Sequence, residues 1–295
     1  MSYIVLLKSS MEIAVVSGKG GTGKSSITAA LAGMKQQLLL ADCDVDAANL
    51  YLLFRPEHTL EQEFISGYKA IIDKERCTNC GICMDYCRFD AIHLIEGEVQ
   101  ISELSCDGCF LCSRVCPEQA IHMEPENKSR LYAGNFRYGK MVYGRLFPGE
   151  ENSGRLVDLV RQQAKETARD NKLDLILMDG PPGIGCPVIS TITGVDKVLI
   201  VTESSMSGLH DLQRIHDLCE HFSLSQAVII NKYDLNPEMT SRIEQYCKEQ
   251  GLKLQAKIPF DHLMVEAMVQ GQSIVEYAPE SPAALCIKNS LEELI

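Results

Sequence analysis

A glycine-rich stretch near the start of the chain constrains the fold more than any other feature. Residues 17–25 read Ser-Gly-Lys-Gly-Gly-Thr-Gly-Lys-Ser, after an apolar run at residues 13–16 and before apolar residues that recur on one helical face. This order predicts a strand, a glycine loop and a helix, which together form a P-loop. Backbone N–H groups at the start of the helix can then surround phosphate oxygens. A glycine-rich turn that matches the pattern by chance is the alternative.

Individual residues of this loop have different expected roles. Lys24 supplies a positive charge to the β- and γ-phosphates of a nucleotide, and Ser25 offers its hydroxyl to Mg²⁺. The loop residues that we expect to bind the nucleotide are Gly18, Gly20, Gly21, Thr22, Gly23, Lys24, Ser25 and Ser26.

Two later apolar runs end in acidic side chains. Residues 37–41 lead into Asp42 and Asp44, and residues 173–178 lead into Asp179. Open parallel sheets bind ligands beyond the carboxyl ends of their strands, so these side chains are site candidates. The carboxylate of Asp179 can hold the Mg²⁺ shell. For Asp42 and Asp44 the alternative is an Asp-rich turn that caps a helix over residues 45–53.

Eight of the thirteen cysteines form two runs with the same spacing. Each run is a bacterial ferredoxin pattern, in which the fourth cysteine ligates the other of two 4Fe-4S clusters. The first predicted ligand set is Cys77, Cys80, Cys83 and Cys116, and the second is Cys87, Cys106, Cys109 and Cys112. Zinc is the alternative, but tetrahedral zinc sites use two separated pairs of ligands.

The two cysteine runs also repeat in the residues that follow them. Asp-Ala-Ile-His at 90–93 corresponds to Gln-Ala-Ile-His at 119–122, which indicates an internal pseudo-twofold. The runs differ at Arg88, a position where such a run often has proline, as at Pro117 after the second run. This departure loosens the local turn but removes no ligand.

Charge and composition exclude several classes of function. The net charge of −12 argues against nonspecific binding to nucleic acid or to anionic lipid. No stretch reaches the roughly eighteen apolar residues that span a bilayer, and we see no export signal. Thirteen cysteines therefore favour cluster ligation over disulfides. We expect a cytoplasmic protein in which residues 1–10 form a short extension outside the fold.

The acidic charge is concentrated around the cysteine runs. Between Asp73 and Glu126 there are eleven Asp and Glu residues against four Lys and Arg residues. An acidic segment of this kind predicts a partner with a basic face, and a merely solvated surface is the alternative.

A second lysine in the glycine loop carries a family resemblance. With Lys19 near the start of the loop, the sequence resembles the ParA/MinD group of P-loop ATPases, which includes the nitrogenase iron protein and is related to the Mrp group. As a whole the chain resembles MinD-superfamily ATPases that contain an inserted ferredoxin domain. The resemblance implies a homodimer in which Lys19 reaches the phosphates of the partner's nucleotide. A solvated loop lysine is the alternative.

The same resemblance implies catalytic and metal-binding roles. Lys19, Lys24 and Asp44 form the implied catalytic set, in which Asp44 orients or activates the attacking water. Ser25, Asp42 and Asp179 are the implied Mg²⁺ set. Cys186 lies seven residues after Asp179, the offset of a cluster-ligating cysteine in the nitrogenase iron protein. A small buried cysteine at a helix start is the alternative for Cys186.

A later strand ends in a possible base-recognition pattern. Asn231, Lys232 and Asp234 form the Asn-Lys-x-Asp pattern by which GTPases recognise guanine. In the resembled ATPases, however, an asparagine at this strand end contacts adenine, and a second loop would correspond to Pro259, Phe260 and Asp261. We therefore expect ATP and keep GTP as the alternative.

These features predict an α/β fold with a doubly wound, mainly parallel P-loop NTPase sheet. A small α+β bacterial-type ferredoxin domain is expected at residues 68–127, inserted into an ATPase domain of residues 1–67 and 128–295. Residues 129–147 mix aromatic and basic side chains, so they could form a nucleic-acid surface, but we favour two strands that return to the sheet. The acidic helix at 282–294 is expected to pack on the sheet and not on a membrane.

The predicted function is a nucleotide-dependent homodimer that couples ATP hydrolysis to electron transfer through two 4Fe-4S clusters. A redox or client protein is the expected partner, with no nucleic acid and no stable membrane association. Two alternatives remain open. One is a carrier or assembly ATPase for iron-sulfur clusters, and the other is a positioning ATPase whose clusters sense redox state.

Overall fold

A nine-stranded sheet organises the first of two compact units in the computed structural model, which describes residues 10–294. The predicted N-terminal extension lies outside the described residues, apart from Ser10. In spatial order the strands are β13 (Lys253–Ile258), β12 (Gln226–Asn231), β11 (Lys197–Glu203), β1 (Met11–Ser17), β10 (Leu175–Pro182), β2 (Leu38–Asp42), β9 (Gly139–Arg145), β8 (Ser129–Phe136) and β3 (Glu57–Phe64). Neighbouring strands from β13 to β9 pair in parallel, so the predicted mainly parallel sheet is confirmed.

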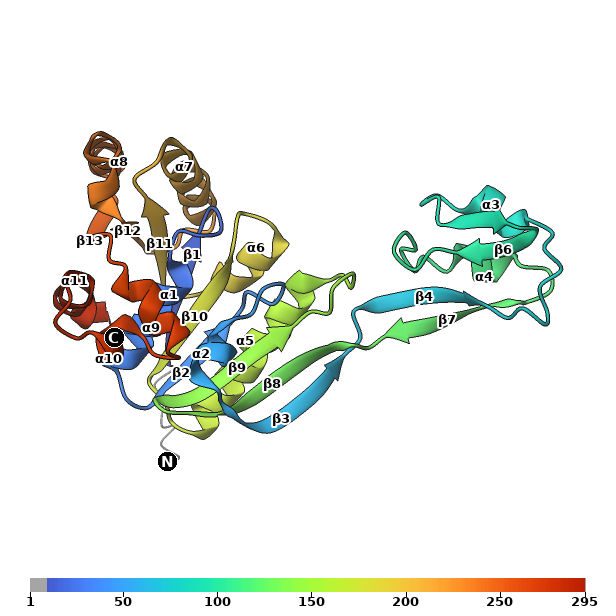
Figure 1. Ribbon diagram of the computed structural model, residues 1–295, viewed down its shortest axis with the longest axis horizontal. Helices are drawn as coiled ribbons and strands as arrows, with labels where there is room; N and C mark the ends of the chain where they lie inside the picture. Colours follow the sequence, from blue (N-terminus) through green and yellow to red (C-terminus); the bar gives the residue numbers. More distant parts are fainter. Residues whose placement is uncertain (1–9, 295) are drawn as a thin grey trace, which may run out of the picture. The chain divides into compact units, whose positions relative to one another are not determined.

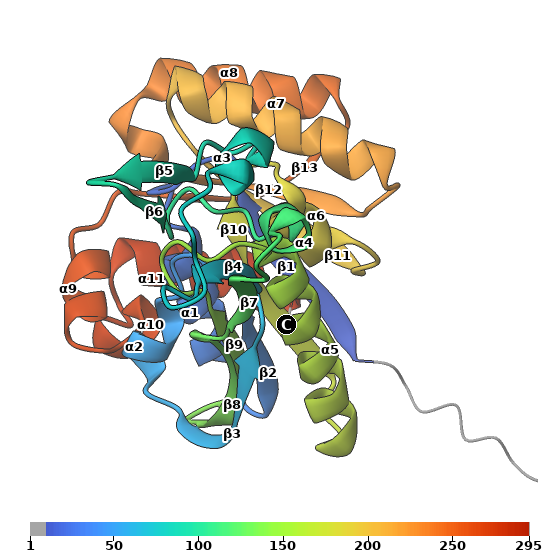
Figure 2. The same cartoon turned by 90° about the vertical axis from the view of Figure 1, so that its right-hand side faces the viewer.

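Helices cover both faces of this sheet (Figure 2). One face carries α1 (Lys24–Met34), α9 (Leu263–Val269), α10 (Ile274–Tyr277) and α11 (Pro282–Leu291). The other carries α5 (Ser153–Asp170), α6 (Cys186–Ile192), α7 (Met206–His221) and α8 (Pro237–Glu249). Short turns of 3₁₀ helix form at η1 (Tyr233–Leu235) and η2 (Glu292–Leu294). Strands enclosed between two helical layers bury both faces, which explains their continuous apolar runs.

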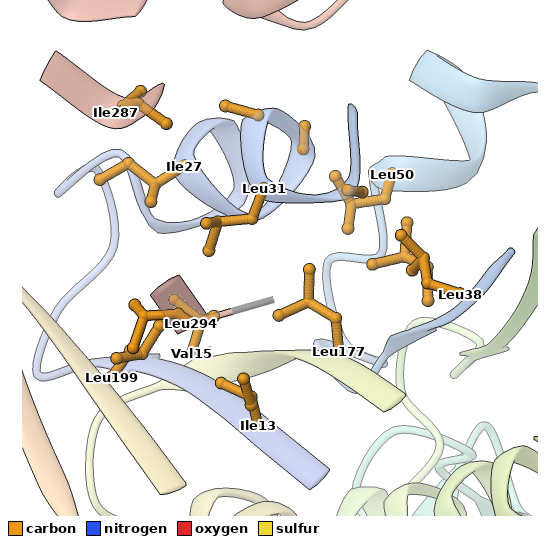
Figure 3. Close-up of a cluster of buried hydrophobic side chains, with 14 of the residues drawn as sticks. Ile13, Val15, Ile27, Leu31, Leu38, Leu50, Leu177, Leu199, Ile287 and Leu294 are labelled. Carbon is orange, nitrogen blue, oxygen red and sulfur yellow. The ribbon is translucent and has the colours of Figure 1, made fainter. Parts of the chain in front are cut away.

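The main core lies between α1 and the sheet. Ile27 and Leu31 of α1 face Val15, Leu177 and Leu199 from three adjacent strands (Figure 3). Ile287 of α11 joins the same cluster, so the C-terminal helix packs on the sheet as predicted. Each aliphatic side chain buried here contributes about 1.5–3 kcal/mol relative to an exposed one.

The helix after β2 begins later than the sequence predicts. It was expected over residues 45–53, whereas α2 spans Leu50–Phe54. The Asp42 carboxylate accepts hydrogen bonds from the backbone N–H groups of Asn49 and Leu50, both at 3.2 Å. Because these bonds satisfy the free N–H groups of the first helical turn, the helix starts there.

The second compact unit comprises Gln62–Arg130 and Leu146–Asn152. In it β4 (Gly67–Ile72) pairs antiparallel with β7 (Ile121–Glu126) (Figure 1). The strands β5 (Ile92–Ile95) and β6 (Glu98–Ile101) also pair antiparallel (Figure 2). Two short helices, α3 (Ile82–Tyr86) and α4 (Leu111–Val115), each carry one cysteine. Its small core contains Ala70, Cys83, Ile92, Val99 and Ile121.

A buried carboxylate explains why residues 146–152 belong to this second unit. Glu150 accepts hydrogen bonds from Ser66 Oγ at 2.9 Å, from the Lys128 backbone N–H at 3.0 Å and from both N–H and Oγ of Ser129. Partial burial opposes ionisation, but these hydrogen bonds lower the pKa of Glu150. The unit therefore includes residues beyond segment 68–127.

Candidate functional site

The loop between β1 and α1 has the geometry of a phosphate cradle. Gly23 precedes α1 with φ at 89°, a left-handed conformation that glycine adopts without strain. A Cβ atom on Gly23 would lie 2.3 Å from Nδ2 of Asn231, and one on Gly18 would lie 2.2 Å from Cβ of Asp211. Both glycines are therefore required by close approach of neighbouring elements. The free N–H groups of α1 are directed toward the loop.

Lys24 lies at the centre of a buried polar network. It is 6% exposed, and its Nζ lies 3.0 Å from Oδ2 of Asp179. Ser25 donates to the same oxygen at 2.6 Å, and Thr28 donates to Oδ1 of Asp179 at 2.8 Å. Burial lowers the pKa of Lys24, but the charges of Asp179 and Asp44 outweigh it and raise the pKa. The lysine is therefore protonated and available to an anionic phosphate.

The two carboxylates at the end of β2, Asp42 and Asp44, have different surroundings. Asp42 is fully buried, and its oxygens accept N–H groups of Asp44, Asn49 and Leu50. Burial and the nearby Asp179 raise the pKa of Asp42 to about 7. Asp44 instead lines a cavity beside the P-loop, and its Oδ2 lies 3.7 Å from Lys24 Nζ. Burial raises the pKa of Asp44 against the opposing effect of Lys24, which makes its carboxylate a better base.

A cavity of about 470 Å³ opens beside the P-loop. The predicted site residues that line it are Lys19, Gly20, Gly21, Thr22, Gly23, Lys24, Ser25, Ser26, Asp44, Asn231, Lys232, Pro259, Phe260 and Asp261. Four others, Gly18, Asp42, Asp179 and Asp234, lie outside this lining. Met264 and Met268 of α9 also line the cavity and were not predicted from the sequence. Their spacing of four residues just after the second loop is the signal that could have identified them.

Three residues predicted to contact the base also make hydrogen bonds to the loops beside the cavity. Asn231 Nδ2 donates to the Thr22 carbonyl at 2.8 Å, and Lys232 Nζ donates to the Gly21 carbonyl at 3.1 Å. Asp234 Oδ1 accepts the Phe260 N–H at 2.7 Å. Thus Asn231 and Lys232 hold the P-loop, and Asp234 holds the second loop.

Asp261 has a similar supporting role at the end of that second loop. Its Oδ1 accepts the N–H of Leu263 at 3.0 Å, at the first residue of α9. The carboxylate therefore fixes the direction in which α9 leaves the loop, and with it the positions of Met264 and Met268.

Lys19 makes contacts within its own chain. Its Nζ lies 2.7 Å from Oε1 of Glu203 and 2.7 Å from Oγ of Ser207, at the start of α7. Lys232 also approaches Glu203, at 3.5 Å. Partial burial opposes ionisation of Glu203, but the hydrogen bond and charge of Lys19 lower its pKa. Lys19 is thus paired with a carboxylate beside the cavity.

The eight clustered cysteines line two separate cavities in the second unit. One is bordered by Cys87, Cys106, Cys109 and Cys112, and the other by Cys77, Cys80, Cys83 and Cys116. The fourth cysteine of each run therefore lies at the cavity of the other run. Within residues 10–294, no three His, Cys, Asp or Glu side chains converge closely enough to hold a single metal ion.

The two cavities are related by the internal repeat. The Ala91 N–H donates to Cys87 Sγ at 3.4 Å, and the Ala120 N–H donates to Cys116 Sγ at 3.3 Å. Left-handed residues also precede both helices, Gly81 before α3 and Phe110 before α4. These matched N–H···S bonds stabilise negative charge on the two sulfurs.

Cys186 is the first residue of α6 and is exposed. The alternative of a small buried cysteine at this helix start is therefore wrong about burial, although the helix start is as predicted. Three further cysteines, Cys43, Cys219 and Cys247, are buried.

Comparisons with known proteins agree with this architecture. The sequence profile of the CobQ/CobB/MinD/ParA nucleotide binding domain matches residues 13–274. An uncharacterized protein of Methanocaldococcus jannaschii is 36% identical over 240 residues, which cover 80% of this chain and 82% of the relative. The iron-sulfur cluster carrier protein of Pyrococcus furiosus is 23% identical over 304 residues, covering 96% of this chain and 85% of the carrier.

A solved structure supports the fold assignment. The septum site-determining protein MinD of Pyrococcus horikoshii, complexed with Mg-ADP, aligns with a TM-score of 0.58. The alignment covers 97% of this chain and 96% of MinD at 22% identity, which shows the shared fold. No helix within residues 10–294 is long and apolar enough to cross a membrane.

Proposed function

The chain belongs to the CobQ/CobB/MinD/ParA nucleotide-binding family, and on that premise we propose an iron-sulfur ATPase that couples ATP hydrolysis to electron transfer. The observation that carries the proposal is that the residues predicted to bind nucleotide and those predicted to bind iron line different cavities. One contains the P-loop residues, and the other two are each bordered by four cysteines. ATPase activity follows from the family, and the redox role is our addition.

The nucleotide site would act through residues already in place. Lys24 would exchange its contact with Asp179 for the β- and γ-phosphates, and Ser25 would turn its hydroxyl toward Mg²⁺. Asp44 would hold the attacking water, because it is the one carboxylate of its segment that lines the cavity and its pKa is raised. Asp42 and Asp179, both fully buried, would orient the Mg²⁺ shell from behind.

The surroundings of the base favour ATP over GTP. Guanine recognition requires the Asp of Asn-Lys-x-Asp to accept hydrogen bonds from the base, but Asp234 lies outside the cavity lining and accepts the Phe260 N–H. The base-side wall is formed instead by Met264, Met268 and Phe260, whose apolar surfaces suit a flat ring.

Homodimerisation is the expected consequence of nucleotide binding. Lys19 is paired with Glu203 in the single chain, so its reach toward a partner's phosphates would require that contact to open. Nucleotide-dependent release of Lys19 would then link the filled site to assembly. Light scattering with and without a slowly hydrolysed ATP analogue measures this association.

The cysteine cavities fit four-iron clusters in donor type and arrangement. In such a cluster each cysteine binds a different iron, so four sulfurs surround a cavity and do not converge on one point. Each cavity has four cysteines around it, and the N–H···S bonds at Cys87 and Cys116 are of the kind that tunes cluster potential. When bound, the clusters would supply one-electron redox chemistry.

The decisive experiment is an anaerobic redox titration followed by electron paramagnetic resonance, with and without ATP or a slowly hydrolysed analogue. Coupling predicts a nucleotide-dependent shift in cluster potential or signal shape. Full iron content without any nucleotide response would remove the support for gated electron transfer. Sensing or cluster delivery would then be the better explanation.

A Lys24→Ala variant separates the two kinds of site. We expect it to abolish ATP binding and hydrolysis, because no other cation is buried beside Asp179 among the described residues. Iron content should stay at the wild-type level, because Lys24 lies in the first unit and the cysteines lie in the second. Loss of iron together with ATP binding would contradict this independence.

A second candidate is delivery of clusters to other proteins, which is favoured by the similarity to an iron-sulfur cluster carrier protein. Delivery requires clusters that leave the protein readily, whereas four cysteines around each cavity predict tight retention. Incubating the iron-loaded protein with an apo-ferredoxin under anaerobic conditions distinguishes the two. Transfer of iron on a timescale of minutes supports the carrier, and retention supports the electron-transfer role.

A further inference from the structure

The second unit exposes apolar side chains on α3 and just after it, and none of the proposals above uses them. Ile82 is 38% exposed, Tyr86 53% and Phe89 43%. Ile82 and Tyr86 are four residues apart and so share one side of the helix, and Phe89 follows three residues later. Arg88, the departure from the usual ferredoxin run, is also exposed. We call Ile82, Tyr86, Arg88 and Phe89 the α3 face.

The internal repeat supplies a comparison within the same unit. The corresponding residues of the second run are Leu111, Val115, Pro117 and Glu118. Leu111 and Val115 are half-buried, and the exposed position that matches Phe89 is a charged glutamate. Two helices in equivalent surroundings therefore differ in their exposed chemistry, which local folding alone does not require. A row of exposed apolar side chains is the usual mark of a protein interface.

The α3 face also borders both cysteine cavities. Ile82 lines the cavity of Cys77, and Phe89 lines the cavity of Cys87. Neither cavity is lined by the other large apolar residues that this unit exposes within the described chain, namely Ile65, Tyr68, Leu94, Ile95, Leu104 and Phe147. A protein bound over α3 would thus lie close to both predicted clusters.

We propose that the α3 face is the docking surface for a one-electron redox protein with basic side chains around an apolar centre. The proposal rests on the proposed function, because it needs loaded clusters. Tyrosine and arginine dominate the centres of protein interfaces, and both are present here. The exposed Asp85 and Asp90 flank the apolar residues, within a segment of eleven acidic and four basic residues. This negative charge favours a partner whose contact surface has basic side chains at its rim.

Electron transfer at this surface makes or breaks no covalent bond and moves no proton. One electron leaves the reduced iron-sulfur site of this chain and reduces one acceptor centre, and each encounter transfers a single electron. In the test, dithionite supplies the electrons and the haem iron of cytochrome c, a small basic protein, passes from Fe(III) to Fe(II).

The test uses the full chain, loaded with iron anaerobically, reduced and freed of excess dithionite. Stopped-flow absorbance follows reduction of cytochrome c by wild type and by Tyr86→Ala and Phe89→Ala. The matched controls are Val115→Ala and Glu118→Ala, at the equivalent positions of the second run. Benzyl viologen serves as a small acceptor that needs no docking surface.

We expect Tyr86→Ala and Phe89→Ala to lower the second-order rate constant for cytochrome c at least about fivefold, as truncation of central interface aromatics does. The two controls should remain within about twofold of wild type, and so should every variant with benzyl viologen. The wild-type rate should fall as ionic strength rises, because attraction between acidic and basic surfaces is screened.

Other outcomes have distinct meanings. Equal effects of the α3 variants and their matched controls, or none at all, would overturn the docking surface. A rate that rises with salt would overturn the basic partner and point to an acidic one. Iron content and dithionite bleaching are measured first on every variant. A wild-type chain that holds no reducible iron would refute the proposed function itself, before docking is tested.

Discussion

At the scale of single residues, some side chains that line the cavity also hold the loops around it. Asn231 shows this most clearly. Its amide donates to the Thr22 carbonyl and accepts a hydrogen bond from the Lys232 N–H at 3.0 Å, and its Nδ2 lies only 2.3 Å from where a Cβ on Gly23 would be. The P-loop therefore keeps its shape through a residue more than 200 positions away in the sequence.

An Asn231→Asp variant tests this support. Aspartate cannot donate to the Thr22 carbonyl, and it adds a buried negative charge beside the phosphate site. Leaving a buried acceptor unpaired costs about 1–3 kcal/mol, so we expect at least about a tenfold weaker affinity for ATP by calorimetry. Asp234→Asn is the control, because its side chain can still accept the Phe260 N–H. Unchanged affinity in Asn231→Asp would contradict the role.

At the scale of elements, one carboxylate joins the β8–β9 turn to α10. Glu276 completes a capping box with Ser273 at the start of α10. Its two oxygens also accept hydrogen bonds from Nε and one terminal nitrogen of Arg137, at 2.7 and 3.0 Å. The Arg137 guanidinium in turn covers the ring of Phe54 at 4.7 Å. A paired, bidentate contact of this kind fixes the two elements more firmly than an exposed ion pair.

The pH dependence of stability tests this contact. Partial burial opposes ionisation, but hydrogen bonds from Arg137 and Tyr138 lower the pKa of Glu276 to about 2 from its usual 4.5. A lowered folded-state pKa stabilises the protein above about pH 4.5, and this contribution is lost as pH falls toward 2. Discounted for partial exposure, Glu276→Gln should cost about 1 kcal/mol at pH 7 in urea unfolding.

The cost of Glu276→Gln should shrink as pH falls from about 4.5 toward 2, because the Glu276 carboxyl is protonated in the unfolded chain before it is protonated in the folded one. Glu249→Gln, at the exposed end of α8, serves as the control and should show little cost at any pH. A cost for Glu276→Gln that stays constant with pH would mean that packing of the side chain, and not its charge, holds α10.

At the scale of the whole molecule, nucleotide and cysteine chemistry are assigned to different compact units. This division follows the course of the chain, which leaves the sheet of the first unit after β3 and returns to it through β8 and β9. Each unit has its own apolar cluster, centred on α1 in the first and on Cys83 and its neighbours in the second. A change at one set of ligands should therefore leave the other set intact.

Double cysteine variants test the crossed arrangement of ligands. Cys77 and Cys116 border the same cavity, so Cys77→Ser with Cys116→Ser should lower bound iron only from about eight to about four atoms per chain. Cys106→Ser with Cys116→Ser removes one ligand from each cavity and should lose nearly all iron. Equal iron contents in the two double variants, measured by colorimetric assay, would contradict the crossing.

Much of the site was predictable because its signals are local. The P-loop, the apolar strands ending at Asp42 and Asp179, and the spacing of eight cysteines all follow from short stretches of chain. The supporting contacts of these loops were less predictable. Asn231 and Asp234 match recognition patterns, and their side chains also hold loops, through hydrogen bonds to Thr22 and Phe260 in other segments of the chain.

The sequence by itself determined which residues are candidates to bind phosphate or iron, since those patterns are read within one strand, loop or helix. Tertiary structure alone decided that α2 begins at Leu50, that Lys19 pairs with Glu203 and that Glu150 draws residues 146–152 into the second unit. Each of these outcomes depends on a carboxylate that bonds to N–H, hydroxyl or ammonium groups from other parts of the chain. Burial makes these bonds important for stability, because an unpaired polar group inside a protein costs free energy.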